Sequence, residues 1–215
     1  MAITAQSIIK AVQEQLQDLA GIRWTAVELI KALNDAQRLL VSIRPDLASV
    51  QLSHPLTAGA KQAAPADCSQ LLEIVRNTSG LSIRMVERRL LDAMEPNWYT
   101  KAGTLSIKHA CVEKAEPYSF YVYPPAALGA SVELVYAKIP ADVPTPSGSA
   151  YTTVTGNINV DDSLDVALMH YCLYWAFSKD AGYGGNITLS GMHFKLYQGA
   201  AGITTPTNPS PPITN

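Results

Sequence analysis

Apolar residues near the amino terminus recur at three- and four-residue spacings, which is the period of an amphipathic helix. The first such stretch begins after Thr4, a residue type that caps helices, and ends at Gly21. The second starts with a capping box at Thr25 and ends before Pro45. Because the link between them is short, the pattern predicts an antiparallel helical hairpin within residues 1–48.

Between residues 49 and 140 the apolar spacing shortens, and Pro, Gly, Ser and Asn interrupt the chain at intervals typical of strands. This pattern predicts an inserted, mostly antiparallel β domain with one helical segment. The strands are expected at residues 49–56, 71–77, 81–86, 104–113, 118–123 and 131–138, the helix at 87–94, and turns at 77–80 and 124–129.

The next segment, residues 139–156, is rich in Pro, Ser, Thr and Gly and has few large apolar side chains. A segment of this composition buries too little apolar surface to fix its own structure. We therefore expect residues 141–160 to form an exposed polar excursion that carries the chain back into helix.

Thirteen uncharged residues, VALMHYCLYWAFS, then occupy positions 166–178. A helix over this run is apolar on two sides, so two separate partners must cover it. One side carries Leu164, Leu168, Tyr171 and Trp175, and the other carries Val166, Met169, Leu173 and Phe177. The run is shorter than the roughly 20 residues that cross a bilayer. It is either a deeply buried core helix or a helix shared between subunits.

Charge and glycine set the limits of this helix and of the one that follows. Asp161, Asp162 and Asp165 precede it and Lys179 ends it, which suits the helix dipole. After the glycine-rich break at 182–186, a last helix is expected at 186–198, followed by an extended tail at 200–215. Overall the pattern predicts an α+β fold, in which the hairpin and the helices within 161–199 form one helical bundle.

Composition adds a preference for assembly. Only 16% of the 215 residues are charged, against about 25% in ordinary soluble domains, so the chain has little charged surface for a monomer. A net charge of −2 removes the general attraction to nucleic acid or anionic membrane. The three scattered cysteines and the absence of a secretory leader indicate buried thiols and synthesis in the cytoplasm.

Few residues are candidates for chemistry. No Walker loop, GxSxG elbow or HExxH helix occurs in the sequence. His109 and Cys111, two apart on a predicted strand, face the same way and are the best metal candidates. Further ligands would have to come from His54, Cys68, Cys172 or His193. An incidental histidine on a half-buried strand is the favoured interpretation.

The remaining clusters also have simple structural explanations. Arg84, Arg88 and Arg89 lack the aromatic platforms of a nucleic-acid site, and ion pairs with Glu73, Glu87 and Asp92 explain them better. Helix-end charge explains the three aspartates without a divalent ion. The tyrosines of YCLYWAF suit packing better than a sugar or cofactor platform. We therefore predict a non-enzymatic protein with no metal and no cofactor.

The order of these parts resembles the head-to-tail adaptor (connector) proteins of tailed bacteriophages, particularly those of short-tailed phages. The resemblance spans residues 4–202. Its most specific pieces are FYVYPPAALGASVELVYAKIP at 120–140 and the helix with its SKDAG ending at 164–182.

This resemblance implies a homo-oligomeric ring of twelve copies that binds under the portal protein in the virion neck. Such a ring extends the DNA channel, lets DNA pass without sequence-specific binding, contacts no membrane, and offers a platform for a tail or nozzle protein. Two alternatives remain open: a tubular or completion protein lower in the tail, and a small-molecule-binding module or hydrolase.

Two groups of site residues follow from this interpretation. The subunit interface is expected at Leu168, Tyr171, Tyr174, Trp175 and Phe177. Portal docking is expected through the tail, at Ile203, Pro206, Pro209, Pro211, Pro212 and Ile213.

Overall fold

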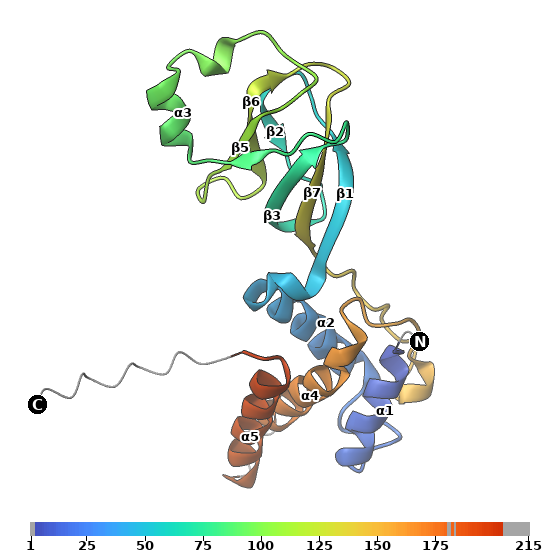
Figure 1. Ribbon diagram of the computed structural model, residues 1–215. Helices are drawn as coiled ribbons and strands as arrows, with labels where there is room; N and C mark the ends of the chain where they lie inside the picture. Colours follow the sequence, from blue (N-terminus) through green and yellow to red (C-terminus); the bar gives the residue numbers. More distant parts are fainter. Residues whose placement is uncertain (1–2, 180–181, 183, 204–215) are drawn as a thin grey trace, which may run out of the picture. The chain divides into compact units, whose positions relative to one another are not determined.

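The computed structural model describes residues 3–179, 182 and 184–203, and its elements are labelled in Figure 1. The chain divides into two compact units. Residues up to Leu39 and from Ala141 onward form the helical unit, and Leu40–Pro140 form the β unit. The α+β class predicted from the sequence is confirmed.

The amino-terminal helices begin at the caps that the sequence indicated. Helix α1 (Ala5–Gln15) starts after Thr4, whose hydroxyl oxygen accepts a hydrogen bond from the Ser7 N–H at 3.2 Å. Helix α2 (Ala26–Ile43) starts after Thr25, whose hydroxyl oxygen accepts from the Glu28 N–H at 3.3 Å. Their apolar faces meet in the core of the helical unit, through Ile8, Ile9, Val12, Leu29, Ile30 and Leu33.

Two further helices complete this unit. Helix α4 (Asp165–Lys179) lies between α1 and α5 (Gly184–Ala200) in Figure 1. The short 3-10 turns of the chain are η1 (Pro45–Ala48), η2 (Trp98–Thr100), η3 (Tyr151–Thr153) and η4 (Asp162–Leu164).

The segment predicted as an exposed polar excursion, 141–160, is exposed at most of its positions but also packs against the helical unit. Val143, Val154 and Ile158 are buried in the same core as α1, α2 and α4. Composition does not indicate this packing, because these aliphatic side chains are widely spaced among polar residues.

Buried amide side chains hold this segment in place. Gln13, fully buried on α1, donates from Nε2 to the carbonyls of Trp24 (3.0 Å) and Ser149 (3.1 Å) and accepts from the Tyr151 N–H (2.9 Å). Asn34 on α2 donates to the Val143 carbonyl and accepts from its N–H. Each amide therefore binds backbone groups of a segment that is neither helix nor strand, and the Ser149 carbonyl also accepts from the Ala26 N–H at the start of α2.

The β unit consists of two sheets. The three-stranded sheet has the order β1-β7-β3, formed by β1 (Ser49–Pro55), β7 (Ser131–Lys138) and β3 (Cys68–Asn77). The four-stranded sheet has the order β2-β6-β5-β4, formed by β2 (Gly59–Ala63), β6 (Ser119–Ala126), β5 (His109–Val112) and β4 (Arg84–Met85). All pairs are antiparallel except β4 with β5.

Several strand predictions differ from the structure. Strand β2 was not predicted, since GAKQA lacks the branched and aromatic residues that mark strands, and its pairing with β6 determines its conformation. The predicted strands at 81–86 and 104–113 shrink to the short β4 and β5. The turn predicted at 124–129 starts later, because β6 continues to Ala126.

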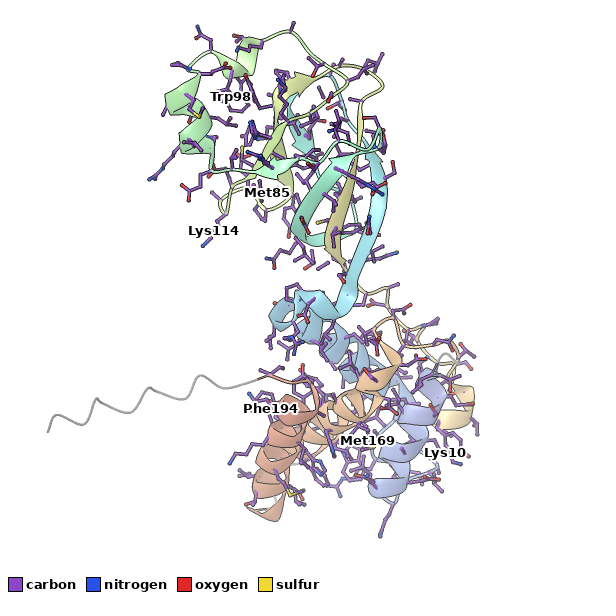
Figure 2. The ribbon with its side chains drawn as sticks, in the orientation of Figure 1. Lys10, Met85, Trp98, Lys114, Met169 and Phe194 are labelled. Carbon is purple, nitrogen blue, oxygen red and sulfur yellow. The ribbon has the colours of Figure 1, made fainter. Side chains whose placement is uncertain are left out.

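Strand β6 is buried on both faces, which explains its continuous apolar sequence. Phe120 and Val122 lie in the core between the two sheets. Tyr121 faces the other way and packs with Trp98 and with Leu91 of α3 (Arg88–Met94); Trp98 is labelled in Figure 2. One strand therefore links the inter-sheet core to the helical cover of this unit.

A buried asparagine joins two loops of the β unit. Asn77 is 1% exposed and its Nδ2 donates to the carbonyls of Leu81 (3.0 Å) and Ile107 (2.8 Å). Its Oδ1 accepts from the Ile107 N–H at 2.8 Å. These bonds connect the end of β3 to the segments that precede β4 and β5.

Replacing Asn77 with alanine should lower the free energy of unfolding by about 2–4 kcal/mol, because the backbone groups of Ile107 lose their partner while buried. Urea denaturation of the full chain measures this. Asn97→Ala in the same unit is the matched control, since Asn97 is exposed and its side chain forms no capping bond. Equal losses in both variants would contradict the anchoring role of Asn77.

Replacing Gln13 with alanine should release the 149–151 segment from the helical unit. We expect an unfolding free energy lower by about 2 kcal/mol and faster proteolysis within residues 144–156, because the Tyr151 N–H and the Trp24 carbonyl lose their bonds to Gln13. Limited proteolysis with mass mapping measures the second effect. Gln15→Ala is the control, because Gln15 is exposed on the same helix. Cleavage at wild-type rates would show that the apolar contacts alone hold the segment.

Candidate assembly interface

Helix α4 finds both of its partners within the helical unit. The two observed sides differ from the two predicted ones. One side packs into the core with α1 and α2 and combines Leu168 with Leu173, both fully buried together with Cys172. The other side packs against α5 and combines Tyr171 with Phe177. Most of the apolar surface of α4, which could also have been buried against another subunit, is therefore covered within one chain.

The predicted interface residues divide into two groups. Leu168 is fully buried, so its side chain has no surface to offer a second copy. Tyr171, Tyr174, Trp175 and Phe177 are half-buried and keep part of their rings accessible. An interface through these four residues remains a prediction.

Three of the four half-buried rings form an aromatic seam with α5. The ring centroids of Tyr171 and Tyr197 lie 5.2 Å apart, and those of Tyr174 and Phe194 lie 4.9 Å apart. Phe177 stacks on His193 with centroids 5.5 Å apart and an interplanar angle of 9°. Figure 2 labels Phe194 on α5. These rings attach α5 to α4.

Trp175, near the end of α4, lies outside the aromatic seam and faces the core of the helical unit. It packs against the helical core, and Lys179 Nζ lies 5.7 Å from its ring centroid. Lys179 also forms an ion pair with Glu28 of α2, and this hydrogen bond lowers the pKa of the Glu28 carboxyl. The Trp24 indole N–H donates to the Ala176 carbonyl at 3.3 Å. These contacts join the start of α2 to the last turn of α4.

A polar line runs along the contact between α4 and α5. The Nδ1 atoms of His170 and His193 lie 3.1 Å apart, so one ring must donate and the other accept. Burial lowers the pKa of both imidazoles, and the neighbouring His170 lowers that of His193 further. Farther along, the hydroxyls of Ser178 and Ser190 lie 2.7 Å apart.

The Tyr197 hydroxyl is buried in this contact without a hydrogen-bond partner among the described residues. Burial raises its pKa to about 12, so the phenol stays protonated at neutral pH. The aromatic packing described above therefore has to compensate for an unsatisfied polar group.

The outer side of α5 is the apolar surface that the sequence analysis did not assign. Leu189, Met192 and Leu196 are 38%, 46% and 44% exposed, and their spacing places them on one face. Lys195 is the only Asp, Glu, Lys or Arg in this 17-residue helix. The near absence of charge in 184–200 indicates this surface in the sequence. The interface was predicted on α4 instead, because the run at 166–178 is more apolar.

The candidate metal ligands do not come together. Among residues 3–179, 182 and 184–203, no group of three or more His, Cys, Asp or Glu side chains is placed to hold a metal ion. His109 stacks on Tyr123, His54 bonds the Ala63 carbonyl, and His193 contacts His170. Cys68, Cys111 and Cys172 are all buried.

The buried thiols are also poorly suited to nucleophilic chemistry. Burial raises the pKa of the Cys111 thiol to about 11 and that of Cys172 to about 12. Both groups are therefore protonated at neutral pH, and it is the thiolate that reacts. The thiol of Cys172 points at the Leu29 carbonyl, 3.9 Å away, inside the helical core.

The expected roles of the charged clusters are found in part: of the ion pairs predicted for Arg84, Arg88 and Arg89, the described residues form the one between Arg88 and Asp92. Asp161 accepts a hydrogen bond from the Ser163 N–H at 2.8 Å, and Asp162 accepts from the Ile3 N–H at 3.0 Å. Arg88 lies within 3.6 Å of Asp92 and 3.8 Å of Glu113. The pair with Glu113 was not predicted.

A hollow of about 390 Å³ on the helical unit bears on the small-molecule alternative. Its charged lining includes Arg38, which forms ion pairs with Asp35 and Asp142. Lys31 and Thr145 also line this hollow, and this lining includes no histidine that could activate them as a base.

Of the predicted portal-docking residues, the structure describes Ile203. Its N–H donates to the Gln198 carbonyl at 2.9 Å, which closes the end of α5, and its side chain is half-buried. The other five lie outside the described residues: Pro206, Pro209, Pro211, Pro212 and Ile213.

The histidine pair predicts a pH-dependent stability of the helical unit. Because the folded-state pKa values lie below those of the unfolded chain, stability is complete above about pH 6.5 and is lost as the pH falls below it. The slope should reach at most ~1.4 kcal/mol per pH unit for each proton bound. Urea midpoints between pH 5 and 8, followed by tryptophan fluorescence, measure it.

The double variant His170→Gln/His193→Gln should have a flatter profile over the same pH range. His54→Gln is the control, because His54 belongs to the β unit. A profile as steep in the double variant as in the wild type would exclude the pair as its source.

Comparison with known proteins completes this description. The family model described as SU10 adaptor protein matches residues 3–212. No curated protein matches the sequence. Among the described helices, none is long and apolar enough to cross a membrane. The resemblance to head-to-tail adaptors is confirmed, and the chain belongs to the SU10 adaptor family, a family of phage head-to-tail adaptor proteins.

Proposed function

We propose that copies of this chain form a dodecameric ring beneath the portal, in the virion neck. The ring extends the DNA channel and offers the attachment platform for a tail or nozzle protein. This role is structural and needs no catalysis. The observation that carries the proposal is the family match, which covers nearly the whole chain.

The charge distribution is consistent with a channel that DNA passes through. The chain has a formal net charge of −2, so the ring as a whole does not attract DNA. Arg88, in the basic cluster, is compensated by carboxylates. This weak electrostatic attraction supports the proposal that DNA passes through the channel without being held.

The tail from 203 to 215 is proposed to dock on the portal. It is polar and carries four prolines, and its large apolar residues are Ile203 and Ile213. Ordering a segment costs about 1–2 kcal/mol of backbone entropy per residue, so a single tail binds weakly. In a ring the tails bind at high effective concentration once the first is docked, which gives a durable joint.

The proposal is tested by mixing the purified full-length chain with the portal ring and imaging the product. We expect a second ring on the narrow end of the portal. Truncation after Ile203 should keep the fold, because the Ile203 bond that ends α5 is retained, and should weaken portal binding at least about tenfold, because the multivalent contribution is lost. Binding is measured by mass photometry at fixed salt.

A chain with residues 204–215 in shuffled order is the matched control for tail composition. Equal binding by the truncated and full-length chains would contradict docking through the tail. Binding to a tail or nozzle protein without any binding to the portal would favour the alternative position lower in the tail. Hydrolysis of small esters or phosphates by the pure chain would favour the enzyme alternative.

A further inference from the structure

The outer face of α5 forms an apolar ridge without a partner among the described residues. The ridge consists of Leu189, Met192 and Leu196, which lie on adjacent turns. Lys195 borders the ridge, is exposed, and forms no ion pair within the part of the chain that the structure describes. An exposed apolar ridge with so little charge around it is typical of a contact surface.

A complementary groove lies on the same unit, between α1 and the start of α4. It has a volume of about 140 Å³ and is lined by Ser7, Ile8, Ala11, Asp165, Val166 and Met169. Val166 is 49% exposed. A cavity of roughly 150 Å³ accommodates a benzene molecule, so this groove has room for one large aliphatic side chain.

The charges at these two surfaces are opposite. Asp165 stands at the groove, its carboxylate accepts a hydrogen bond from the Val166 N–H at 2.6 Å, and it forms no ion pair with any described residue. Lys195 stands beside the ridge. Each surface therefore combines apolar side chains with one uncompensated charge of opposite sign, and the surfaces can satisfy each other.

We propose that the α5 ridge of one copy packs into the α1/α4 groove of the next copy, with Lys195 facing Asp165 of the neighbour. This inference rests on the proposed function, which requires copies of the chain to meet in a ring. It names the two surfaces by which they meet, and it moves the principal contact from α4 to α5.

The placement of ridge and groove suits a closed ring. On α4, the mean direction of Val166 and Met169 lies about 110° around the helix axis from the mean direction of Tyr171, Tyr174 and Phe177, which contact α5, by the 3.6-residue period. Ridge and groove thus face different directions on one unit, and Met169 is seen on α4 beside α1 in Figure 2. A contact between two different surfaces repeats from copy to copy and closes when the rotation allows it.

Cysteine cross-linking tests this pairing directly in the full-length chain. The native thiols are buried, so a bifunctional maleimide should react chiefly with introduced cysteines. Two double variants, Val166→Cys with Met192→Cys and Val166→Cys with Leu196→Cys, should each give a ladder of covalent multimers. The reaction is run with the chain alone at high concentration and again on the portal ring.

The single variants distinguish other occupants of the ridge. Met192→Cys alone should give no multimer, whereas a cross-linked dimer would show that α5 meets α5 and would overturn the proposal. Cross-linking of Met192→Cys to the portal would assign the ridge to the portal instead. The absence of a ladder from both double variants also overturns the proposal.

Charge reversal provides a second, independent test. Lys195→Glu and Asp165→Lys should each raise the concentration for half-assembly about fivefold, the effect expected for an accessible ion pair. The double reversal should restore wild-type assembly. Loss of assembly in both singles without rescue in the double variant would contradict the Lys195–Asp165 contact.

Met192→Glu should weaken assembly at least about tenfold, because it buries an unpaired charge. Met94→Glu is the matched control, since Met94 is 72% exposed in the β unit. Urea midpoints establish that both variants fold. Portal binding without a ladder of cross-linked multimers would overturn this interface and leave the adaptor function intact. A ladder without portal binding would support this interface and contradict the adaptor function.

Discussion

The structure of the helical unit depends on covering α4 on two sides. A helix this apolar cannot face water, and α1 and α2 shield only one of its sides, where Leu168 and Cys172 are buried. Helix α5 covers another side through Tyr171, Tyr174 and Phe177. Because α5 also carries apolar side chains on its outer face, it covers α4 while Leu189, Met192 and Leu196 stay exposed. The apolar surface that lacks a partner therefore lies on α5 and not on α4, and a neighbouring copy can cover it.

The sequence was sufficient wherever local chemistry determines the structure. Thr4 and Thr25 cap the helices at the predicted positions, and the alternation in 131–138 matches β7. The sequence was not sufficient where contacts between distant segments determine the structure. Strand β2 has almost no apolar signal of its own and exists because β6 pairs with it. Val143 and Ile158 are isolated aliphatic residues in a polar segment, so their burial could not be recognised without the helices that receive them.

The same distinction applies to the candidate interface. The apolar spacing correctly indicated that α4 has more apolar surface than one partner can cover. It could not indicate which helix would cover which side. Tyr171 and Phe177 were placed on two different sides from the sequence, and in the structure both contact α5, through Tyr197 and His193. The outer ridge of α5 can be identified only once these contacts within the chain are known. It is the apolar surface that they leave exposed.

This arrangement also links assembly to the packing inside each copy. Helix α5 packs chiefly on α4, through the aromatic seam and the His170–His193 contact. A neighbour that binds the ridge binds only the conformation in which α5 is docked, so it stabilises that conformation by mass action. The unsatisfied Tyr197 hydroxyl and the proton-sensitive histidine pair weaken the same docking within a single copy. It follows that α5 should be held less firmly in the free chain than in the ring, and that acid conditions should oppose assembly through this contact before they unfold the rest of the helical unit.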